Sequence, residues 1–172
     1  MVAEMEQSFI TVGRYSFKYK QHCGPTAITN LILSYRPELD PDEVFRKVAR
    51  IGTSHLIYWN MDFHRIFGGT SNALAGAFIR MSLREYGLDA LKVRFRGHSG
   101  LKKLRRATDK DHAVFLVLTH HPKYKNHHVL CYGVKDTESG PALLLADGWK
   151  GRPVLMPYKW QDMVLSVFYE IG

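Results

Sequence analysis

The sequence predicts an α+β fold, with helices in the first half of the chain and an antiparallel β-sheet in the second. Helical periodicity and helix-cap residues occur up to residue 87, whereas short runs of Val, Leu, Phe and Tyr separated by turn residues follow from residue 90. Helices and strands that are segregated in this way do not form alternating βαβ units. A length of 172 residues, of which 45% are hydrophobic, suits one hydrophobic core, so we expect a single domain over residues 1–172.

The first two helices are indicated by the residues at their starts. Residues 24–36 are expected to be helical, because Pro25 suits a first turn, where its missing N–H has no intrahelical partner. Asp40 followed by Pro41 indicates the N-cap and first position of a second helix, which ends near Gly52. Both segments carry apolar residues at helical spacing, so each is expected to bury one face.

The segment 53–71 is rich in aromatic residues without a clear period, and we expect it to be irregular. A third helix is predicted over roughly 72–86, with Thr70 or Ser71 as its cap and Gly87 as its terminating residue. The large apolar side chains of this region are expected in the core: Met61, Phe63, Phe67, Phe78 and Met81.

Five short strands are predicted after the helices, at residues 90–96, 113–119, 127–134, 142–147 and 165–170. Turn residues separate them, and the turn at Asp136–Gly140 is expected to join the third and fourth of these strands as a hairpin. In such a hairpin the start of one strand lies beside the end of the next.

Composition excludes several classes of protein. The two cysteines, Cys23 and Cys131, cannot build a disulfide framework or a metal site made of cysteines alone. No apolar run approaches the ~18–20 residues that cross a bilayer, and the first residues lack the pattern of a secretion signal. We therefore expect a cytoplasmic protein without a transmembrane segment.

A thiol stands at the predicted start of the first helix. Cys23 precedes Gly24 and Pro25, and the helix dipole with its unpaired N–H groups favours a thiolate there. The same N–H groups can stabilise an oxyanion during acyl transfer. Gly24 is expected to leave room for a substrate backbone, so Cys23 suits the role of nucleophile, whereas Cys131 in an apolar strand is expected to be a packing residue.

A nucleophilic cysteine needs a base, usually a histidine that a third group orients. His127 begins a predicted strand and Asp147 ends the next one, so the hairpin would place them side by side. Together with Cys23 they predict a Cys–His–Asp triad. His128 is the alternative base, and only one of these two histidines is expected to point toward the thiol, because neighbouring strand residues face opposite sides. Asp136 is the alternative third member, although it lies in the predicted turn.

The sequence resembles papain-like cysteine peptidases, most closely the branch of bacteriocin-processing (double-glycine) peptidases and their stand-alone relatives. The resemblance covers about residues 17–170 and rests on Cys23-Gly24-Pro25-Thr26-Ala27, on His127 with Val129 and Gly133, and on Ala146-Asp147-Gly148. It implies a papain-like fold, with Cys23 as nucleophile, His127 as general base and acid, and Asp147 as the orienting group. It also implies a peptide or protein substrate.

One position departs from that family's pattern. The family usually places a glutamine five or six residues before the cysteine to complete the oxyanion hole, whereas Lys18 and Phe17 stand there in this sequence. Gln21 is the nearest glutamine before the cysteine. Gln21, Tyr19 and backbone N–H groups are therefore the candidates for this role.

The formal net charge of +8 is concentrated in one segment. Residues 92–106 contain no acid and seven basic residues, which are Lys92, Arg94, Arg96, Lys102, Lys103, Arg105 and Arg106. The first half of this segment is expected to be a strand with one cationic face, and the second half a short helix with Leu101 and Leu104 inward. The segment is expected to be a solvated face or to bind an acidic peptide or protein, with nucleic acid as a less favoured partner.

Two functions of different classes follow from these residues. The first is a cysteine hydrolase or acyltransferase that acts through Cys23, His127 and Asp147. The alternative is a non-catalytic papain-like or basic binding module for nucleic acid or an acidic partner. A zinc site built from the histidine pairs at 120–121 and 127–128 is disfavoured because adjacent side chains of a strand diverge, so neither a metal nor a cofactor is expected.

Overall fold

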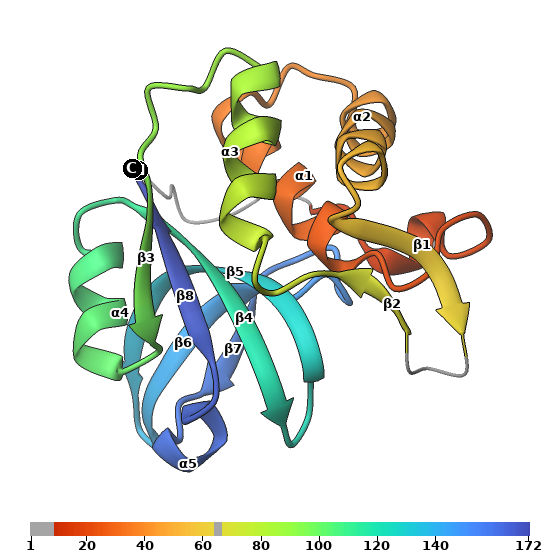
Figure 1. Cartoon of the computed structure of the whole chain (residues 1–172). Coiled ribbons are helices and arrows are strands. Elements are labelled where there is room, and N and C mark those ends of the chain that lie inside the picture. The colour runs from red at the N-terminus through yellow and green to blue at the C-terminus, as the bar shows by residue number, and fades with distance from the viewer. Residues whose placement is uncertain (1–8, 64–66) are drawn as a thin grey trace.

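The computed structural model of the chain describes residues 9–63 and 67–172. Three helices and a β-hairpin precede most of a six-stranded antiparallel sheet, so the predicted α+β class is confirmed (Figure 1). The helical elements are η1 (Val12–Tyr15), α1 (Cys23–Tyr35), α2 (Pro41–Ser54), α3 (Ala75–Glu85), α4 (Leu101–Thr108) and α5 (Trp160–Met163). The strands are β1 (Tyr58–Phe63), β2 (Phe67–Thr70), β3 (Val93–His98), β4 (Ala113–His121), β5 (Lys125–Thr137), β6 (Gly140–Ala146), β7 (Val154–Pro157) and β8 (Val167–Ile171).

The large sheet has the strand order β3-β8-β4-β5-β6-β7, and all neighbours are antiparallel. Strands β5 and β6 form the predicted hairpin, with Leu130 opposite Ala146 and Thr137 opposite Gly140. The five predicted strands correspond to β3, β4, β5, β6 and β8. Neither β7 nor α5 was predicted, because four residues are too few to show a period.

The sheet has a hydrophobic core on each face. In β4 the side chains of Phe115 and Val117 join the core formed with α1, α2 and α3, whereas those of Leu116 and Leu118 join a second core that includes Leu104 of α4. Figure 1 shows α1–α3 above the sheet, and α4 packs against β4 and β5 through the second core. Because both faces of β4 are covered, its sequence is almost continuously apolar instead of alternating.

The first two helices begin as the sequence predicts. Asp40 is the N-cap of α2, where its side chain accepts a hydrogen bond of 2.8 Å from the N–H of Glu43, and Pro41 is the first helical residue. Cys23 is the first residue of α1, and Pro25 lies in the first turn. The predicted inward-facing residue Leu104 of α4 is fully buried.

The prediction of an irregular segment at 53–71 is wrong. The segment contains the end of α2 and the hairpin of β1 and β2, which gives its aromatic residues a pleated surface. Ser71 is held at the end of this hairpin by a 2.8 Å bond from its N–H to the carbonyl of Ile57. Neither Thr70 nor Ser71 therefore caps α3, whose N-cap is Leu74. Gly87 does follow α3 with a φ of +68°, in the predicted terminating conformation.

The core prediction for this region is confirmed only in part. Phe78 is fully buried, and Met81 packs partly buried against the main core. Met61 is 48% exposed, because β1 belongs to a two-stranded hairpin with one open face, so its assignment to the core is wrong. The side chains of Phe63 and Phe67 lie outside the described residues.

The start of α1 is in close contact with β2. A Cβ added at Gly24 would lie 2.2 Å from Oγ1 and 2.8 Å from Cβ of Thr70. The expectation that Gly24 leaves room for a substrate is therefore wrong, since Thr70 of β2 fills that space. The glycine instead allows the hairpin to approach the helix.

No helix within residues 9–63 and 67–172 is both long and apolar enough to cross a membrane.

The contact between Gly24 and Thr70 predicts the effect of a single added carbon atom. Gly24→Ala should lower the free energy of unfolding by about 1–3 kcal/mol, because overpacking forces the helix and the hairpin apart. Gly13→Ala is the control, since its added Cβ would meet only Thr11 Oγ1 at 3.7 Å. Urea denaturation of both variants measures the difference, and equal stabilities of the two would contradict the close contact.

Candidate active site

The thiol of Cys23 lies at the start of α1, where the preceding loop is tied to β1. Gln21 has a φ of +45°, a left-handed conformation that turns the chain into the helix. The N–H of Lys20 donates to Asn60 Oδ1 over 2.7 Å, and Tyr58 Oη donates to the Lys20 carbonyl over 2.7 Å. These bonds fix the loop, so the partly exposed thiol has a defined position.

Both histidines at the start of β5 interact with this thiol. The Nδ1 of His128 lies 3.3 Å from Cys23 Sγ, in a hydrogen bond. His127 lines the cleft together with Cys23, and its interaction with the thiol raises the pKa of His127. The assignment of His127 to the face toward the thiol, with His128 on the other face, is therefore wrong. His128 lies on the same face of β5 as Leu130 and Tyr132, whose side chains join the core formed with α1, so the alternation of strand faces itself turns His128 toward the thiol. Val129 and Cys131, which share the face of His127, join the second core.

The two imidazoles determine the protonation of the thiol. Burial alone would raise the pKa of Cys23, but the charges and hydrogen bonds of His128 and His127 hold this pKa well below its ordinary value. Burial alone would lower the pKa of His127, but interactions with Cys23 and Asp147 raise this pKa above its ordinary value. The arrangement therefore favours a thiolate beside an imidazolium.

A backbone carbonyl orients His127. Its Nε2 lies 2.7 Å from the carbonyl oxygen of Asp147, which can only accept, so Nε2 carries the hydrogen. Tyr124 stacks on the ring with an interplanar angle of 3°, and Trp149 lies with its ring centre 5.3 Å away. The ring is 6% exposed, so its tautomer and orientation are both fixed by these neighbours.

The side chain of Asp147 organises the turn after β6. Its Oδ1 accepts from the N–H groups of Trp149 and Lys150, at 2.9 and 3.0 Å, and its Oδ2 accepts from Tyr124 Oη at 3.2 Å. The structure thus brings the three predicted triad residues together. The difference from the predicted triad is that the hydrogen bond of His127 goes to the backbone of Asp147, and its carboxylate acts on the ring through charge.

The thiol opens into a cleft of about 1050 Å³ between the 12–23 segment, the hairpin of β1 and β2, and the start of β5. Gln21 lines this cleft and lies against Gly68 and Gly69, since a Cβ at Gly69 would be 3.2 Å from its Oε1. Tyr19 lines it as well and packs edge-on against His22. Both sequence candidates for the oxyanion site therefore lie near the thiol.

The sequence analysis did not place Thr70 at the cleft, and it did not predict the hydrogen bond of His128 to the thiol. Thr70 Oγ1 and His128 Nε2 are buried polar atoms without a hydrogen-bond partner in the described part of the chain. No local signal identifies Thr70, because its place over the helix start depends on the hairpin. Tyr124 could have been proposed from the sequence, because it stands three residues before the candidate base His127.

The other residues considered in the sequence lie elsewhere. Cys131 is fully buried in the second core, and burial raises its pKa to about 12. Asp136 forms a two-pronged ion pair with Arg105, with distances of 2.7 and 3.0 Å, on the exposed surface. It does not contact the histidines. Within the described residues, no group of three or more His, Cys, Asp or Glu side chains has the arrangement of a metal site.

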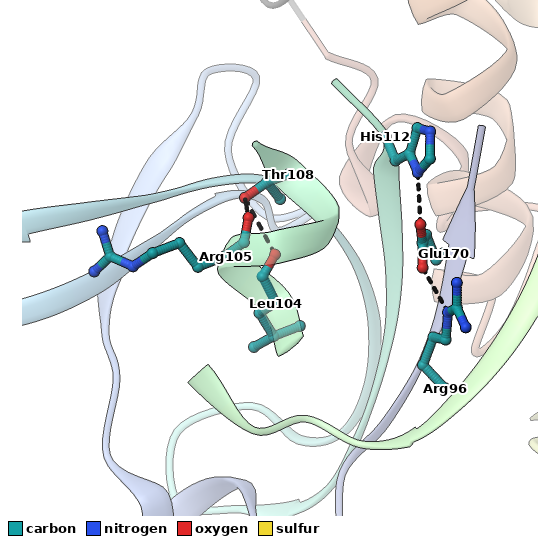
Figure 2. Close-up of polar contacts among 6 residues, drawn as sticks. All are labelled: Arg96, Leu104, Arg105, Thr108, His112 and Glu170. Atoms are coloured by element: carbon teal, nitrogen blue, oxygen red, sulfur yellow. Dashed lines mark hydrogen bonds and ion pairs between the residues drawn. The ribbon is translucent and has the colours of Figure 1, made fainter. Parts of the chain in front are cut away.

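The seven residues of the basic segment do not form one surface. Arg96 pairs with the buried Glu170, which also binds His112 over 2.6 Å, and Arg105 extends away from that cluster (Figure 2). The segment contains no acid, but two acids from β5 and β8 neutralise part of its charge. The side chains of Lys92, Arg94, Lys102, Lys103 and Arg106 have no salt bridge to any described carboxylate.

Comparison of the chain with protein-family models, with curated proteins and with solved structures gives no match.

The lowered pKa of Cys23 predicts its reactivity. Alkylation by iodoacetamide should be fast at pH 7 and should decline only when the pH falls through this lowered pKa, because the thiolate is the reacting form. Cys131, buried and with a pKa of about 12, should react only after unfolding. Mass spectrometry of each modified cysteine over a pH series measures both rates.

Replacing either imidazole should move this pH profile upward. His128→Gln and His127→Gln each remove one of the groups that favour the thiolate. His98→Gln is the matched control, since His98 lies exposed on β3. An unchanged profile in both site variants would contradict the pairing.

The hydrogen bonds of Asp147 predict different effects for two substitutions. Asp147→Ala should cost about 1–3 kcal/mol of stability, since two backbone N–H groups lose their acceptor, whereas Asp147→Asn retains one acceptor oxygen and should cost less. The His127 bond to the backbone remains in both. Asp147→Asn should therefore keep most of the Cys23 alkylation rate, and a complete loss of that rate in a stable variant would show that the carboxylate orients the ring directly.

Proposed function

We propose that the protein is a cysteine-dependent hydrolase or acyltransferase with a papain-like arrangement, acting on a peptide or related amide. The observation that carries the proposal is the thiol of Cys23 at a helix start, hydrogen-bonded to His128 and lining a large cleft together with His127. A nucleophile, a base and space for a substrate are the minimum that acyl transfer requires.

The nucleophile is the Cys23 thiolate. Its charge is stabilised by the positive end of α1 and by the imidazoles. The first turn of the helix closes when the Thr26 N–H bonds to the His22 carbonyl over 2.9 Å, and Pro25 has no N–H. Helix geometry therefore leaves the N–H groups of Cys23 and Gly24 as backbone donors at this end.

His127 is the general base and acid. Its Nε2 is committed to the Asp147 carbonyl, so Nδ1 is the atom that exchanges a proton at the thiol. The Nδ1 of His128 lies 3.3 Å from Sγ, and its Nε2 is buried without a partner among the described residues, so this ring offers the thiol a single hydrogen bond. Its role is to stabilise the thiolate through the hydrogen bond, as a positioning residue.

The reaction proceeds in two steps. The thiolate attacks the amide carbonyl carbon, and the intermediate collapses as the C–N bond breaks and His127 gives its proton to the leaving amine. This leaves a thioester on Cys23. Neutral His127 then takes a proton from water, which attacks the thioester, so the C–S bond breaks and the acid product leaves. An amine in place of water would complete acyl transfer.

The oxyanion that forms in both steps needs donors beside the thiol. Gln21 supports this role because its side chain lines the cleft against Gly68 and Gly69. It acts together with the backbone N–H groups of Cys23 and Gly24. In enzymes with related chemistry, removal of one oxyanion donor lowers kcat by about 10²–10³-fold.

The cleft also bears on the substrate. Its described lining includes Lys20 and no carboxylate, and it combines the half-exposed apolar side chains of Trp59 and Met61 with polar groups such as Asn126. This composition supports a peptide that carries apolar side chains and is neutral or acidic.

Acyl-enzyme formation tests the proposal without knowledge of the natural substrate. A panel of peptide p-nitrophenyl esters should give a burst of nitrophenolate and a mass increase on Cys23, which Cys23→Ser removes and Cys131→Ser leaves unchanged. His127→Gln should lower turnover by ~10²–10⁴, as expected for loss of a general base. His128→Gln should lower it less, since the base remains.

An acylation rate that is equal in the parent and in Cys23→Ser would contradict the proposal. The non-catalytic binding module would then be favoured. A larger loss in His128→Gln than in His127→Gln would keep the hydrolase and exchange the roles of the two histidines.

A further inference from the structure

A second hollow lies on the other side of the molecule, between α4 and the β3 edge of the sheet. Its volume is about 370 Å³, and it shares no lining residue with the Cys23 cleft. Phe168 of β8 and Ala107 of α4 are buried at its base. This volume is at the lower end of the ~300–1,000 Å³ of small-molecule pockets.

Four cations and one carboxylate line this hollow. Arg96 belongs to β3, and Lys103, Arg106 and Lys110 belong to α4 and the turn that follows it. The carboxylate is Glu170, whose two oxygens are already occupied by Arg96 and His112 (Figure 2). An excess of positive charge therefore remains around the hollow.

Three of these cations come from α4 and the turn that follows it. Lys103 and Arg106 are three residues apart in α4, so they lie on one side of the helix, and Lys110 in the next turn lines the same hollow. None of them has a salt bridge with a carboxylate of the described residues. Lys103 Nζ instead donates to the backbone carbonyl of Arg96 over 3.4 Å, which links α4 to β3 at the hollow.

These charges work against the helix that carries them. The first turn of α4 has no acidic residue, and Lys102 and Lys103 lie there beside the positive end of the helix dipole. Like charges at a spacing of three residues, as in Lys103 and Arg106, also repel each other. The distribution of positive charge in α4 therefore lowers the stability of this short helix. Residues that lower stability in this way are expected at functional sites.

The arrangement fits a compact anion better than a long one. Arg105 is turned to Asp136, and the backbone of Lys92 pairs with Gly172 at the end of β3. The basic segment therefore does not provide the continuous row of cations that follows a nucleic-acid backbone. A phosphate group carries up to two charges and several acceptor oxygens, which suits converging Lys and Arg donors.

We propose that the hollow between α4 and β3 binds a small ligand that carries a phosphate or diphosphate group, held by Lys103, Arg106 and Lys110, with Arg96 positioned beside them by Glu170. This site is separate from the thiol cleft, and the proposal does not depend on the proposed hydrolase activity.

Calorimetric titration of the full chain with inorganic pyrophosphate and with ADP tests the site. Both should bind, and the double variant Lys103→Gln with Arg106→Gln should bind at least about tenfold more weakly, since two charge-assisted contacts are lost. The matched control is Lys92→Gln with Lys102→Gln, which removes the same charge outside the hollow and should bind as the parent does. Lys110→Gln provides a single variant with an intermediate loss. Circular dichroism checks that each variant is folded.

Three results would overturn the proposal. One is no binding of either probe by the folded parent at physiological salt. Another is equal weakening in the double variant and its control, which would indicate a general positive field. The third is binding of a single-stranded oligonucleotide that is tighter than that of both probes and equally sensitive to both double variants, which would indicate a nucleic-acid surface. Binding of pyrophosphate as tight as that of ADP would support recognition of the phosphate groups alone.

Discussion

The packing of the first turn of α1 against the start of β5 is the contact on which the rest of the structure depends. It joins the helical part to the sheet and places Cys23 beside the imidazoles of β5. The segment before α1 is held against the same helix, because the side chain of Asn30 in α1 forms two hydrogen bonds with the backbone of Ile10. The hairpin of β1 and β2 is placed by the same turn through Gly24. A shift of α1 would therefore displace the thiol, one wall of the cleft and the N-terminal segment together.

The sheet separates two regions of different chemistry. Both faces of β4 are buried, so the centre of the sheet is held by two cores and provides a rigid support. The thiol cleft belongs to the side of α1, and the cationic hollow lies against α4. Since the two share no lining residue, each can change in sequence with little direct effect on the other.

Much of the fold could be predicted because its signals are local. The cap at Asp40, the turn before Gly140 and the position of Cys23 each depend on a few adjacent residues. The remaining features depend on partners that are distant in sequence. Thr70 meets α1 only because β2 pairs with β1, and the contact of His128 with the thiol depends on which face of β5 is covered by α1. The position of Asp147 was predictable from the sequence. The hydrogen bond from His127 to the backbone carbonyl of Asp147 was not, because every residue has a carbonyl and the sequence does not single one out.

The thiol and the two imidazoles share one opening to the solvent. Cys23, His127 and His128 all line the same cleft, and the bond from His127 Nε2 to the Asp147 carbonyl holds one of the rings in a fixed orientation. A molecule that fills this cleft would therefore separate all three side chains from bulk water at the same time, in a site whose polar groups are already in place.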